Sequence, residues 1–441
     1  MSSAAQKAIT LAMRSGANAA DALIITSRDL TASIRNGAPE TIEQSEACGL
    51  GIRVFVDKKT ATLSTSDLSH TAIERMVDSA IAIAKAAPED PFVALADAAL
   101  LAAKLPELDL ADSAEPSMSE LQQLARECEA AGRNEKGITN SEGADASWGT
   151  LQVGLFTSHG VAHEYTTTHG GLSLSLIAGE GEDMQRDYAY CSKRFMRDVR
   201  SAESIGKEAA SRTLRRMKPR KINSTNMPII FEPRVGKQLL GAFTGAISGS
   251  AIARGTSFLK NDLGAAIFAK NITIIDDPLI KRGLASRPCD GEGVAVKKQE
   301  MVSNGTLNNW LLDTRSANQL GMKTTGHASR SLSSAPHPSA SNLYIAAGTQ
   351  TPEALMQETG KALYITETFG HGVNLITGDY SQGASGFMVE NGEMTYPVSE
   401  ITIAGNLREL FANLTAANDL HFEYGFNVPT LRVANMAIAG S

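Results

Sequence analysis

The spacing of apolar residues changes several times along the chain, and each spacing predicts a different kind of element. Where apolar residues recur every three to four positions, the pattern predicts amphipathic helices. Where they alternate with polar residues, or form short Val-, Ile- and Thr-rich runs, the pattern predicts strands. The predicted helices cover residues 4–15, 73–84, 117–128, 202–217, 235–246 and 407–414. The predicted strands cover residues 22–26, 30–35, 49–56, 60–66, several short stretches within 147–190, then 229–231, 294–302, 307–312, 387–390, 394–398 and 430–439.

Turn signals join many of these strands in sequential pairs. Asn-Gly occurs at Asn36-Gly37, Asn304-Gly305 and Asn391-Gly392. Both residues of this dipeptide tolerate a positive φ, so it favours tight hairpins. Ser117 followed by Glu120 predicts a capping box at the start of a helix. Thr351-Pro352 places a cap and then Pro at the first position of a short helix.

The order of these elements predicts an α+β fold with two domains, because helices and strands do not alternate as βαβ units. A polar, basic segment that contains Pro219 runs from Lys218 to Met227 and is the best domain boundary. We therefore expect an N-terminal mixed α/β-sheet domain over residues 1–220 and a strand-rich C-terminal domain over 221–441. Residues 88–116 are rich in Pro, Asp and Ala and predict an irregular excursion.

Composition excludes several functional classes. The 441 residues are 42% hydrophobic and 20% charged, a composition that excludes a largely disordered chain. The net charge of −7 is unfavourable for binding nucleic acid. The four cysteines form no C-x-x-C pair, which fits a reducing compartment. No signal-like segment and no apolar run of about 18 residues is found, so we expect a cytoplasmic protein that does not bind membranes.

No complete catalytic motif is found by inspection. His163 and His169 frame the segment HEYTTTH, but their spacing is i, i+6 and the three threonines favour a strand. Two His residues six apart in a strand lie about 20 Å apart, too far to share a metal. His327 and His371 are flanked by glycines and are weaker candidates for a base or ligand, although a polar turn residue is the commoner reading of a lone loop histidine.

The segment from Thr377 to Gly386 is rich in glycine and serine and is interpreted as a loop that a ligand backbone can approach closely. A plain loop with tight turns is an equally good reading. The candidate cleft residues in it are Thr377, Gly378, Asp379, Tyr380, Ser381 and Gly383.

A resemblance adds what these motifs leave open. Ordered blocks in the C-terminal half, among them residues 283–286, 309–312, 316–320, 324–327, 376–381 and 386–407, resemble the TldD/PmbA family, once called modulators of DNA gyrase. Residues 64–69, 138–143 and 186–190 agree, so the resemblance covers essentially the whole chain. It is closest to the PmbA (TldE) branch.

The resemblance implies a two-domain α+β subunit of a cytoplasmic metallopeptidase complex that cleaves unfolded peptides. In the catalytic TldD-like partner, a helix carries H-E-x-x-x-H, and a cysteine completes the zinc site. The corresponding helix here covers about residues 235–253 and has no His, Glu or Cys after Glu232. The resemblance therefore implies that this chain is non-catalytic and holds no cofactor. The zinc of the complex is then expected in a TldD-like partner.

Two alternatives remain open at this point. The chain could be a peptidase with its own site near His327, His371 or Asp379, or a regulatory protein that binds DNA gyrase. A homodimer in the absence of the TldD-like partner is a further expectation.

Overall fold

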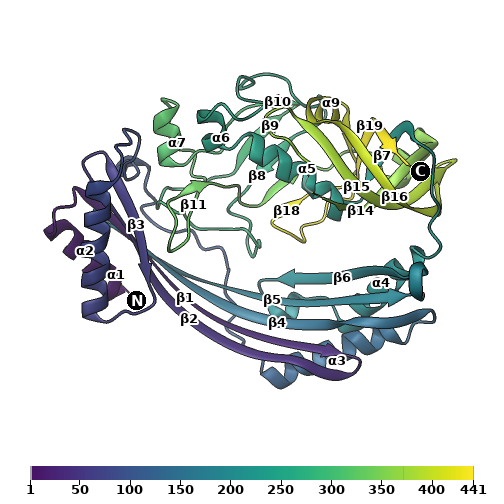
Figure 1. Cartoon of the computed structure of the whole chain (residues 1–441), viewed down its shortest axis with the longest axis horizontal. Coiled ribbons are helices and arrows are strands. Elements are labelled where there is room, and N and C mark those ends of the chain that lie inside the picture. Colours follow the sequence, from purple (N-terminus) through teal and green to yellow (C-terminus); the bar gives the residue numbers. More distant parts are fainter. Residues whose placement is uncertain (1, 371, 441) are drawn as a thin grey trace.

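The computed structural model describes residues 2–370 and 372–440, which form two halves facing each other (Figure 1). The first half is one large sheet with four helices, and the second is rich in strands, so the predicted α+β class is confirmed. The elements of the first half are α1 (Ser2–Arg14), β1 (Ala19–Arg35), β2 (Ala38–Val56), β3 (Lys59–Thr65), α2 (His70–Ala86), α3 (Met118–Arg133), β4 (Ile138–Thr157), β5 (Ala162–Ala178), β6 (Gln185–Lys193) and α4 (Ala202–Arg215).

The large sheet is antiparallel throughout, in the order β3-β2-β1-β4-β5-β6, and its long strands curve (Figure 1). Side chains alternate between two faces. One face is apolar: α1 and α2 cover one end of it and α3 and α4 cover the other. The opposite face looks toward the second half, and we call it the cleft face.

The turn between β1 and β2 is a hairpin at the predicted Asn36-Gly37, where both residues have positive φ. Glu129 of α3 accepts hydrogen bonds from the backbone N–H groups of Asn36 and Gly37, both at 2.7 Å. This buried carboxylate therefore attaches α3 to the tip of the hairpin. The helix itself begins at the predicted capping box of Ser117 and Glu120.

The second half contains a sheet in the order β16-β15-β14-β7-β19-β17, which closes on itself because β16 also pairs with β19. A five-stranded and a two-stranded sheet lie beside it. The elements are β7 (Thr225–Phe231), α5 (Pro233–Ala246), α6 (Gly249–Ala253), β8 (Ile274–Asp276), β9 (Gln299–Ser303), β10 (Thr306–Leu307), α7 (Thr314–Gln319), β11 (Ala328–Ser329), β12 (His337–Pro338), β13 (Leu343–Ile345), α8 (Pro352–Thr359), β14 (Lys361–Phe369), β15 (Asp379–Glu390), β16 (Glu393–Asn406), α9 (Leu407–Ala412), β17 (Leu414–Ala416), β18 (Phe426–Asn427) and β19 (Leu431–Ala439). No helix in the described chain has the length and apolar character needed to cross a bilayer.

Several expected elements differ from the structure. The short strands expected within 147–190 are parts of the long strands β4 and β5 and of β6, and the strands expected at 294–302 and 307–312 are reduced to the short β9 and β10. The two strands expected at 22–26 and 30–35 are one strand, β1, because β2 and β4 pair with it on both sides through the polar residues between. The helix predicted from apolar spacing over 235–246 is confirmed as α5, but the longer helix that the family resemblance places over about 235–253 is interrupted after Ala246, where Leu311 exchanges backbone hydrogen bonds with Ile247 and Gly249. The predicted loop over 377–386 is a strand from Asp379 onward.

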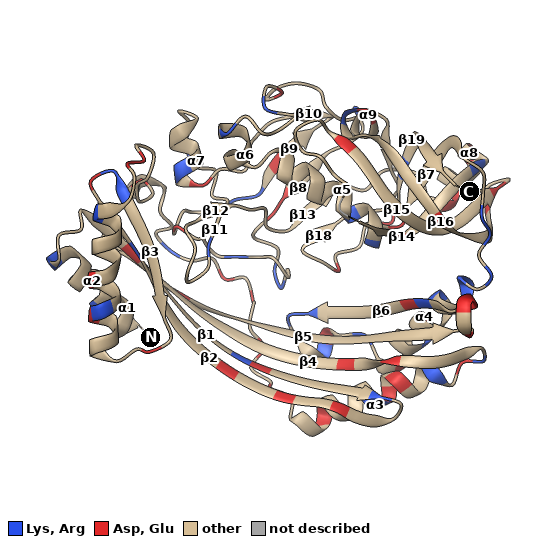
Figure 2. Ribbon diagram, in the orientation of Figure 1, with Lys and Arg blue, Asp and Glu red and all other residues tan. Residues whose placement is uncertain are grey.

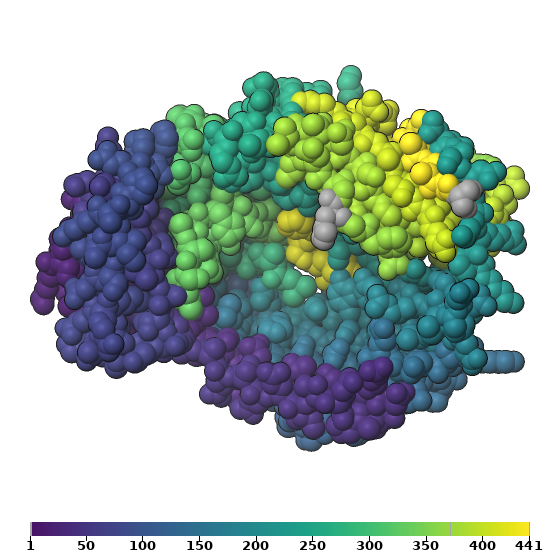
Figure 3. Space-filling view, viewed as in Figure 1, coloured from purple at the N-terminus to yellow at the C-terminus, as the bar shows by residue number. Residues whose placement is uncertain are grey.

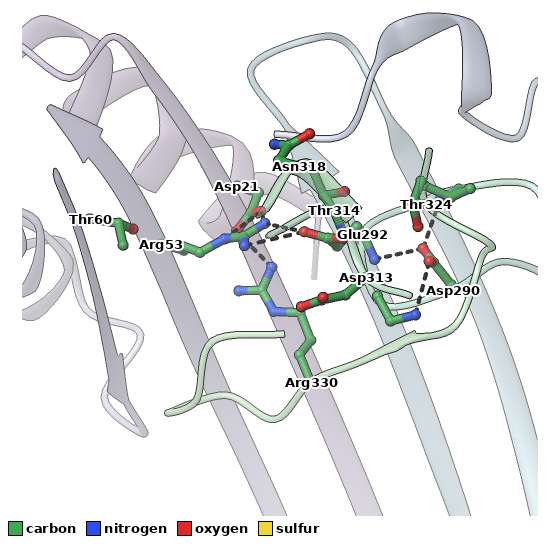
Figure 4. Close-up of polar contacts among 12 residues, drawn as sticks. Asp21, Arg53, Thr60, Asp290, Glu292, Asp313, Thr314, Asn318, Thr324 and Arg330 are labelled. Carbon is green, nitrogen blue, oxygen red and sulfur yellow. Dashed lines mark hydrogen bonds and ion pairs between the residues drawn. The ribbon is translucent and has the colours of Figure 1, made fainter. Parts of the chain in front are cut away.

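A buried ion cluster joins the two halves (Figure 4). Arg53 of β2 hydrogen-bonds Asp21 of β1 and lies 3.3 Å from Glu292 of the second half. Arg330, also of the second half, reaches the other oxygen of Asp21 at 2.6 Å. All four side chains are at most 6% exposed. Burial opposes ionisation of Asp21, but Arg330 and Arg53 outweigh it and lower its pKa.

A second set of ion pairs joins the halves at the far end of the sheet. Asp187 of β6 accepts a hydrogen bond from Arg234 of α5 at 2.9 Å, and its other oxygen forms an ion pair with the same guanidinium at 2.8 Å. Arg234 also contacts Glu232, which Arg212 of α4 reaches at 2.7 Å. Arg216 forms ion pairs with both Asp187 and Glu367 of β14. The two halves are thus joined at both ends of the sheet.

Replacing Arg53 by methionine is expected to lower the free energy of unfolding by about 3–5 kcal/mol, because two buried carboxylates lose their shared cation. Chemical denaturation with a tryptophan fluorescence readout measures the change. Arg35→Met is the matched control, since Arg35 pairs with Glu40 on the exposed surface and should cost no more than about 1 kcal/mol. Equal losses in both variants would contradict the importance of the buried cluster.

The same pair of proteins should also differ in acid. The pKa of Asp21 is lowered in the folded chain, so its ionised form stabilises the fold above its ordinary value of 3.8, and this stabilisation is lost as the pH falls through the folded pKa. We therefore expect the stability difference between wild type and Arg53→Met to be constant above about pH 5 and to shrink below about pH 4. A difference that grows in acid would show that the pair has been misassigned.

Candidate functional site

The cleft face of the large sheet carries a groove of about 570 Å³. This volume lies in the range of about 300–1,000 Å³ typical of ligand sites. In the space-filling view, the molecule is hollowed between the teal strands and the green and yellow second half (Figure 3). All the residues that line the groove come from β4, β5 and β6.

Small and hydroxyl-bearing side chains make up the floor of this groove. In β5 the run Leu172–Leu176 alternates Leu and Ser, so the leucines pack under α3 and α4 while Ser173 and Ser175 point into the groove. Ser147 of β4 and Ser192 of β6 lie beside Gly171 on the same face. The floor therefore offers hydrogen-bonding groups without bulky side chains, which suits an extended polypeptide.

Acidic residues lie along the strands on this side of the molecule, on β2 and β4 (Figure 2). In the groove, Glu142 accepts hydrogen bonds from Ser175 and from Arg186 of β6. Asp145 accepts one from Ser33 of β1. The carboxylates are thus held by neighbours within the sheet.

His169 of β5 faces Asp29 of β1 across Gly149 of β4, with 3.8 Å between the imidazole Nε2 and the carboxylate. A Cβ atom on Gly149 would lie 2.3 Å from both side chains, so only glycine permits this approach. Burial lowers the pKa of His169 despite Asp29. His163 and His169 both belong to β5, which confirms the strand predicted for HEYTTTH.

Two tyrosines of β6 form the wall of the groove that faces the second half. Tyr188 and Tyr190 stack with their ring centres 6.0 Å apart. Lys237 of α5 donates a hydrogen bond to the hydroxyl of Tyr190 at 3.1 Å, and its ammonium lies 3.8 Å from the ring centre of Tyr424. The contact joins the sheet to α5 beside the groove.

The side of α5 that is not buried in the core carries no zinc ligand. Its accessible positions are Pro233, Arg234, Lys237, Gln238, Gly241, Thr244 and Gly245. Zinc in proteins is held by Cys, His, Asp or Glu, and Glu232, just before the helix, is occupied by Arg212 and Arg234. Among the described residues, no three such side chains are grouped so as to hold a metal ion. The residues of this helix do not fit a catalytic metal.

The candidate residues at 377–383 lie in the second half, outside the groove. Asp379 accepts hydrogen bonds from Thr377 and Asn406, which lower its pKa. Tyr380 is buried in the main core. The structure thus divides these residues between a turn at Thr377–Gly378 and the strand β15.

The remaining members of that set lie within β15. Ser381 is exposed, while Gly383 packs against Phe369 so closely that a Cβ atom would lie 2.4 Å from the ring. Phe369 follows Thr368, which bonds Gln238 of α5. The segment therefore runs near α5, and a role for it in peptide binding stays a prediction.

His327 is buried and fully bonded. Its Nδ1 lies 2.8 Å from the hydroxyl of Thr325 and its Nε2 lies 3.2 Å from Asp276. Asp276 also accepts two hydrogen bonds from Ser341. With the imidazole only 1% exposed, this network stabilises the core and offers no access to a substrate. His371 lies outside the described residues.

The sequence contains residue patterns that contribute to the groove, but the motif search did not identify them as a site. The Leu-Ser alternation of β5 and the Tyr-Ala-Tyr run of β6 each place polar side chains on one face. Which face becomes a groove depends on the second half, and Lys237 comes from a helix distant in sequence. Only the folded chain brings these residues together.

Comparisons with known proteins agree over the whole chain. Three family models match: PmbA/TldA metallopeptidase domain 1 over residues 20–84, the central domain over 111–217 and the C-terminal domain over 224–440. The chain is 40% identical to Metalloprotease PmbA of Escherichia coli O157:H7, covering 96% of this chain and 92% of that protein. It is 36% identical to a PmbA homologue of Haemophilus influenzae, covering 98% and 95% of the two chains.

Solved structures show the same fold. A candidate modulator of DNA gyrase from Bacteroides thetaiotaomicron matches with a TM-score of 0.92 and 26% identity, covering 100% of this chain and 99% of that one. TldE from Thermococcus kodakarensis matches with a TM-score of 0.88 at 19% identity, covering 99% and 100%, and shows the fold alone. From the family models and the close relatives together, the chain belongs to the PmbA/TldD metallopeptidase family.

Proposed function

We propose that this chain is the non-catalytic, peptide-binding subunit of a cytoplasmic metallopeptidase complex, whose zinc and catalytic residues belong to a TldD-like partner. The observation that carries the proposal is the composition of α5. Its accessible positions offer cationic, amide, hydroxyl and glycine groups, and none of these replaces the His, Glu or Cys ligands of zinc.

The groove supports the second part of the proposal. An unfolded peptide presents backbone N–H and C=O groups at regular spacing, and serine hydroxyls both donate and accept hydrogen bonds. The sequence-independent contacts of such a floor fit a substrate defined by its extended state rather than by its side chains. In this chain we therefore assign peptide positioning to the cleft face of β4–β6, and bond cleavage to the partner.

The decisive assay compares three samples: this chain, its TldD-like partner, and their mixture. Each is given an unfolded peptide, and bound zinc is measured by elemental analysis. We expect cleavage in the mixture only, sensitive to a chelator, with zinc bound to the partner. Stoichiometric zinc and chelator-sensitive cleavage in this chain alone would overturn the proposal in favour of a peptidase with its own site. Specific capture of DNA gyrase subunits in place of a TldD-like chain would favour a regulatory role.

A bulky side chain in the groove should weaken peptide binding without preventing the chain from folding. Ser173→Trp places an indole above the floor and is expected to weaken peptide binding by about tenfold or more, equivalent to at least about 1.4 kcal/mol. Fluorescence anisotropy of a labelled unfolded peptide measures the affinity. Ser211→Trp is the matched control, because Ser211 is exposed on α4, which covers the opposite face of the same sheet. Unchanged binding by folded Ser173→Trp would remove the groove from the site.

The candidate glycines at 378 and 383 need a different test from bulky replacement. Gly378 has a φ of +84°, and Gly383 contacts the ring of Phe369, so a β-branched residue at either position would disturb the fold first. Ser381 is the suitable probe of this segment because its side chain is exposed.

A further inference from the structure

Lys237, beside the groove, has no carboxylate partner, unlike two neighbouring arginines. Arg186 pairs with Glu142, and Arg234 pairs with Asp187 and Glu232. Within the described residues, no Asp or Glu oxygen lies within 4.0 Å of the Lys237 ammonium. Its only close polar contact there is the hydroxyl of Tyr190, at 3.1 Å.

Two aromatic rings fix the position of this ammonium. It lies 3.8 Å from the ring centre of Tyr424 and 5.8 Å from that of Tyr190, and the two rings are 5.4 Å apart. Cation–π contacts hold a lysine head in place without neutralising its charge. The side chain is therefore ordered in advance while its positive charge remains available to a further anion.

The position of Lys237 beside the groove indicates which anion could reach its charge. Tyr190 lines the groove, and the bond from Lys237 to Tyr190 is where the sheet meets α5. Lys237 does not itself line the groove, but its ammonium lies beside the groove-lining Tyr190, at the edge where β6 meets α5. An extended peptide whose last residue lies over Tyr190 would bring its α-carboxylate, the anion that every unmodified peptide carries at that end, toward this ammonium.

We infer that Lys237, held by Tyr190 and Tyr424, binds the free C-terminal carboxylate of the peptide in the groove. This inference rests on the proposed function. It adds where the peptide lies in the groove, because the C-terminus of the substrate is anchored at the junction of β6 and α5. Lys237 acts in recognition and takes no part in bond cleavage.

The test uses the full chain, alone and mixed with its TldD-like partner, and three labelled unfolded peptides without internal Asp or Glu. The first has a free C-terminus, the second has a C-terminal amide, and the third has a C-terminal amide after a final Glu. Charge-assisted hydrogen bonds contribute about 1.5–3 kcal/mol, so we expect amidation to weaken binding to the wild type by about 10- to 100-fold. The amidated peptide with Glu should bind as weakly as the plain amide.

The variants ask whether Lys237 is the source of this discrimination. In Lys237→Gln the free and amidated peptides should bind equally, whereas Lys237→Arg should retain a preference for the free carboxylate. Lys85→Gln, an exposed lysine on α2, should behave as the wild type. A merely structural role for Lys237 would lower the affinity for both peptides and keep their ratio.

The outcomes separate the inference from the proposed function. Equal binding of free and amidated peptides to the wild type, or an unchanged ratio in Lys237→Gln, would overturn the C-terminal anchor while leaving the groove intact. Recovery of tight binding by the final Glu would show a general carboxylate site instead, and would also overturn it. Failure of all three peptides to bind would overturn the proposed function and this inference with it.

Discussion

The salt-linked contact of Asp21, Arg53, Glu292 and Arg330 sets the relation between the two halves, and the cleft depends on that relation. Arg53 is held near one end of the long sheet, while Glu292 and Arg330 belong to loops of the second half. Buried charges of this kind are costly unless each keeps its partner, so the halves cannot slide without exposing an unpaired ion. Together with the Asp187–Arg234 contact at the other end, the cluster fixes the second half above the sheet and leaves the groove between the two attachments.

The groove exists because the cleft face of the sheet has two regions of different character. One region packs against the second half, and the other does not. Near Arg53 the cleft face carries Leu23, Val153 and Leu155, which pack against Leu332 of the second half. Further along the same strands these positions become Ser and Gly, and close packing ends. A cluster of apolar side chains at this point would have joined the halves along their whole length. The change from aliphatic to Ser and Gly residues along β4 thus ends the interface and leaves the groove open.

Much of the fold could be predicted from the sequence, and the errors have physical causes. The Asn-Gly turns, the capping box at Ser117 and the Leu-Ser alternation of β5 are local signals, and the structure follows them. The apolar spacing predicts the end of α5 at Ala246, but the contact that interrupts the helix there involves Leu311, more than sixty residues away, and no local signal indicates it. The strand character of 379–386 was hidden by glycines that local rules assign to a loop, although Gly383 and Gly386 are needed where neighbouring strands and rings approach.

The candidate site shows the same division. The absence of zinc ligands in α5 could be predicted from the residues themselves, as could the acidic balance that disfavours nucleic acid. The cluster of Lys237 with two tyrosines beside the groove could not, because Tyr190, Lys237 and Tyr424 meet only when β6, α5 and the segment before β18 pack together. His327, prominent as a glycine-flanked histidine, is explained in the fold by its hydrogen bonds to Thr325 and Asp276.

Photo-crosslinking from the groove asks whether this surface holds an unfolded polypeptide. A photoreactive amino acid at position 173 and another at position 211 place the same probe on the two sides of the sheet. In the presence of a labelled unfolded peptide, we predict a crosslink from position 173 that an excess of unlabelled peptide abolishes, and none from position 211. Equal labelling from both positions, or labelling from position 173 that competitor does not reduce, would contradict peptide binding in the groove.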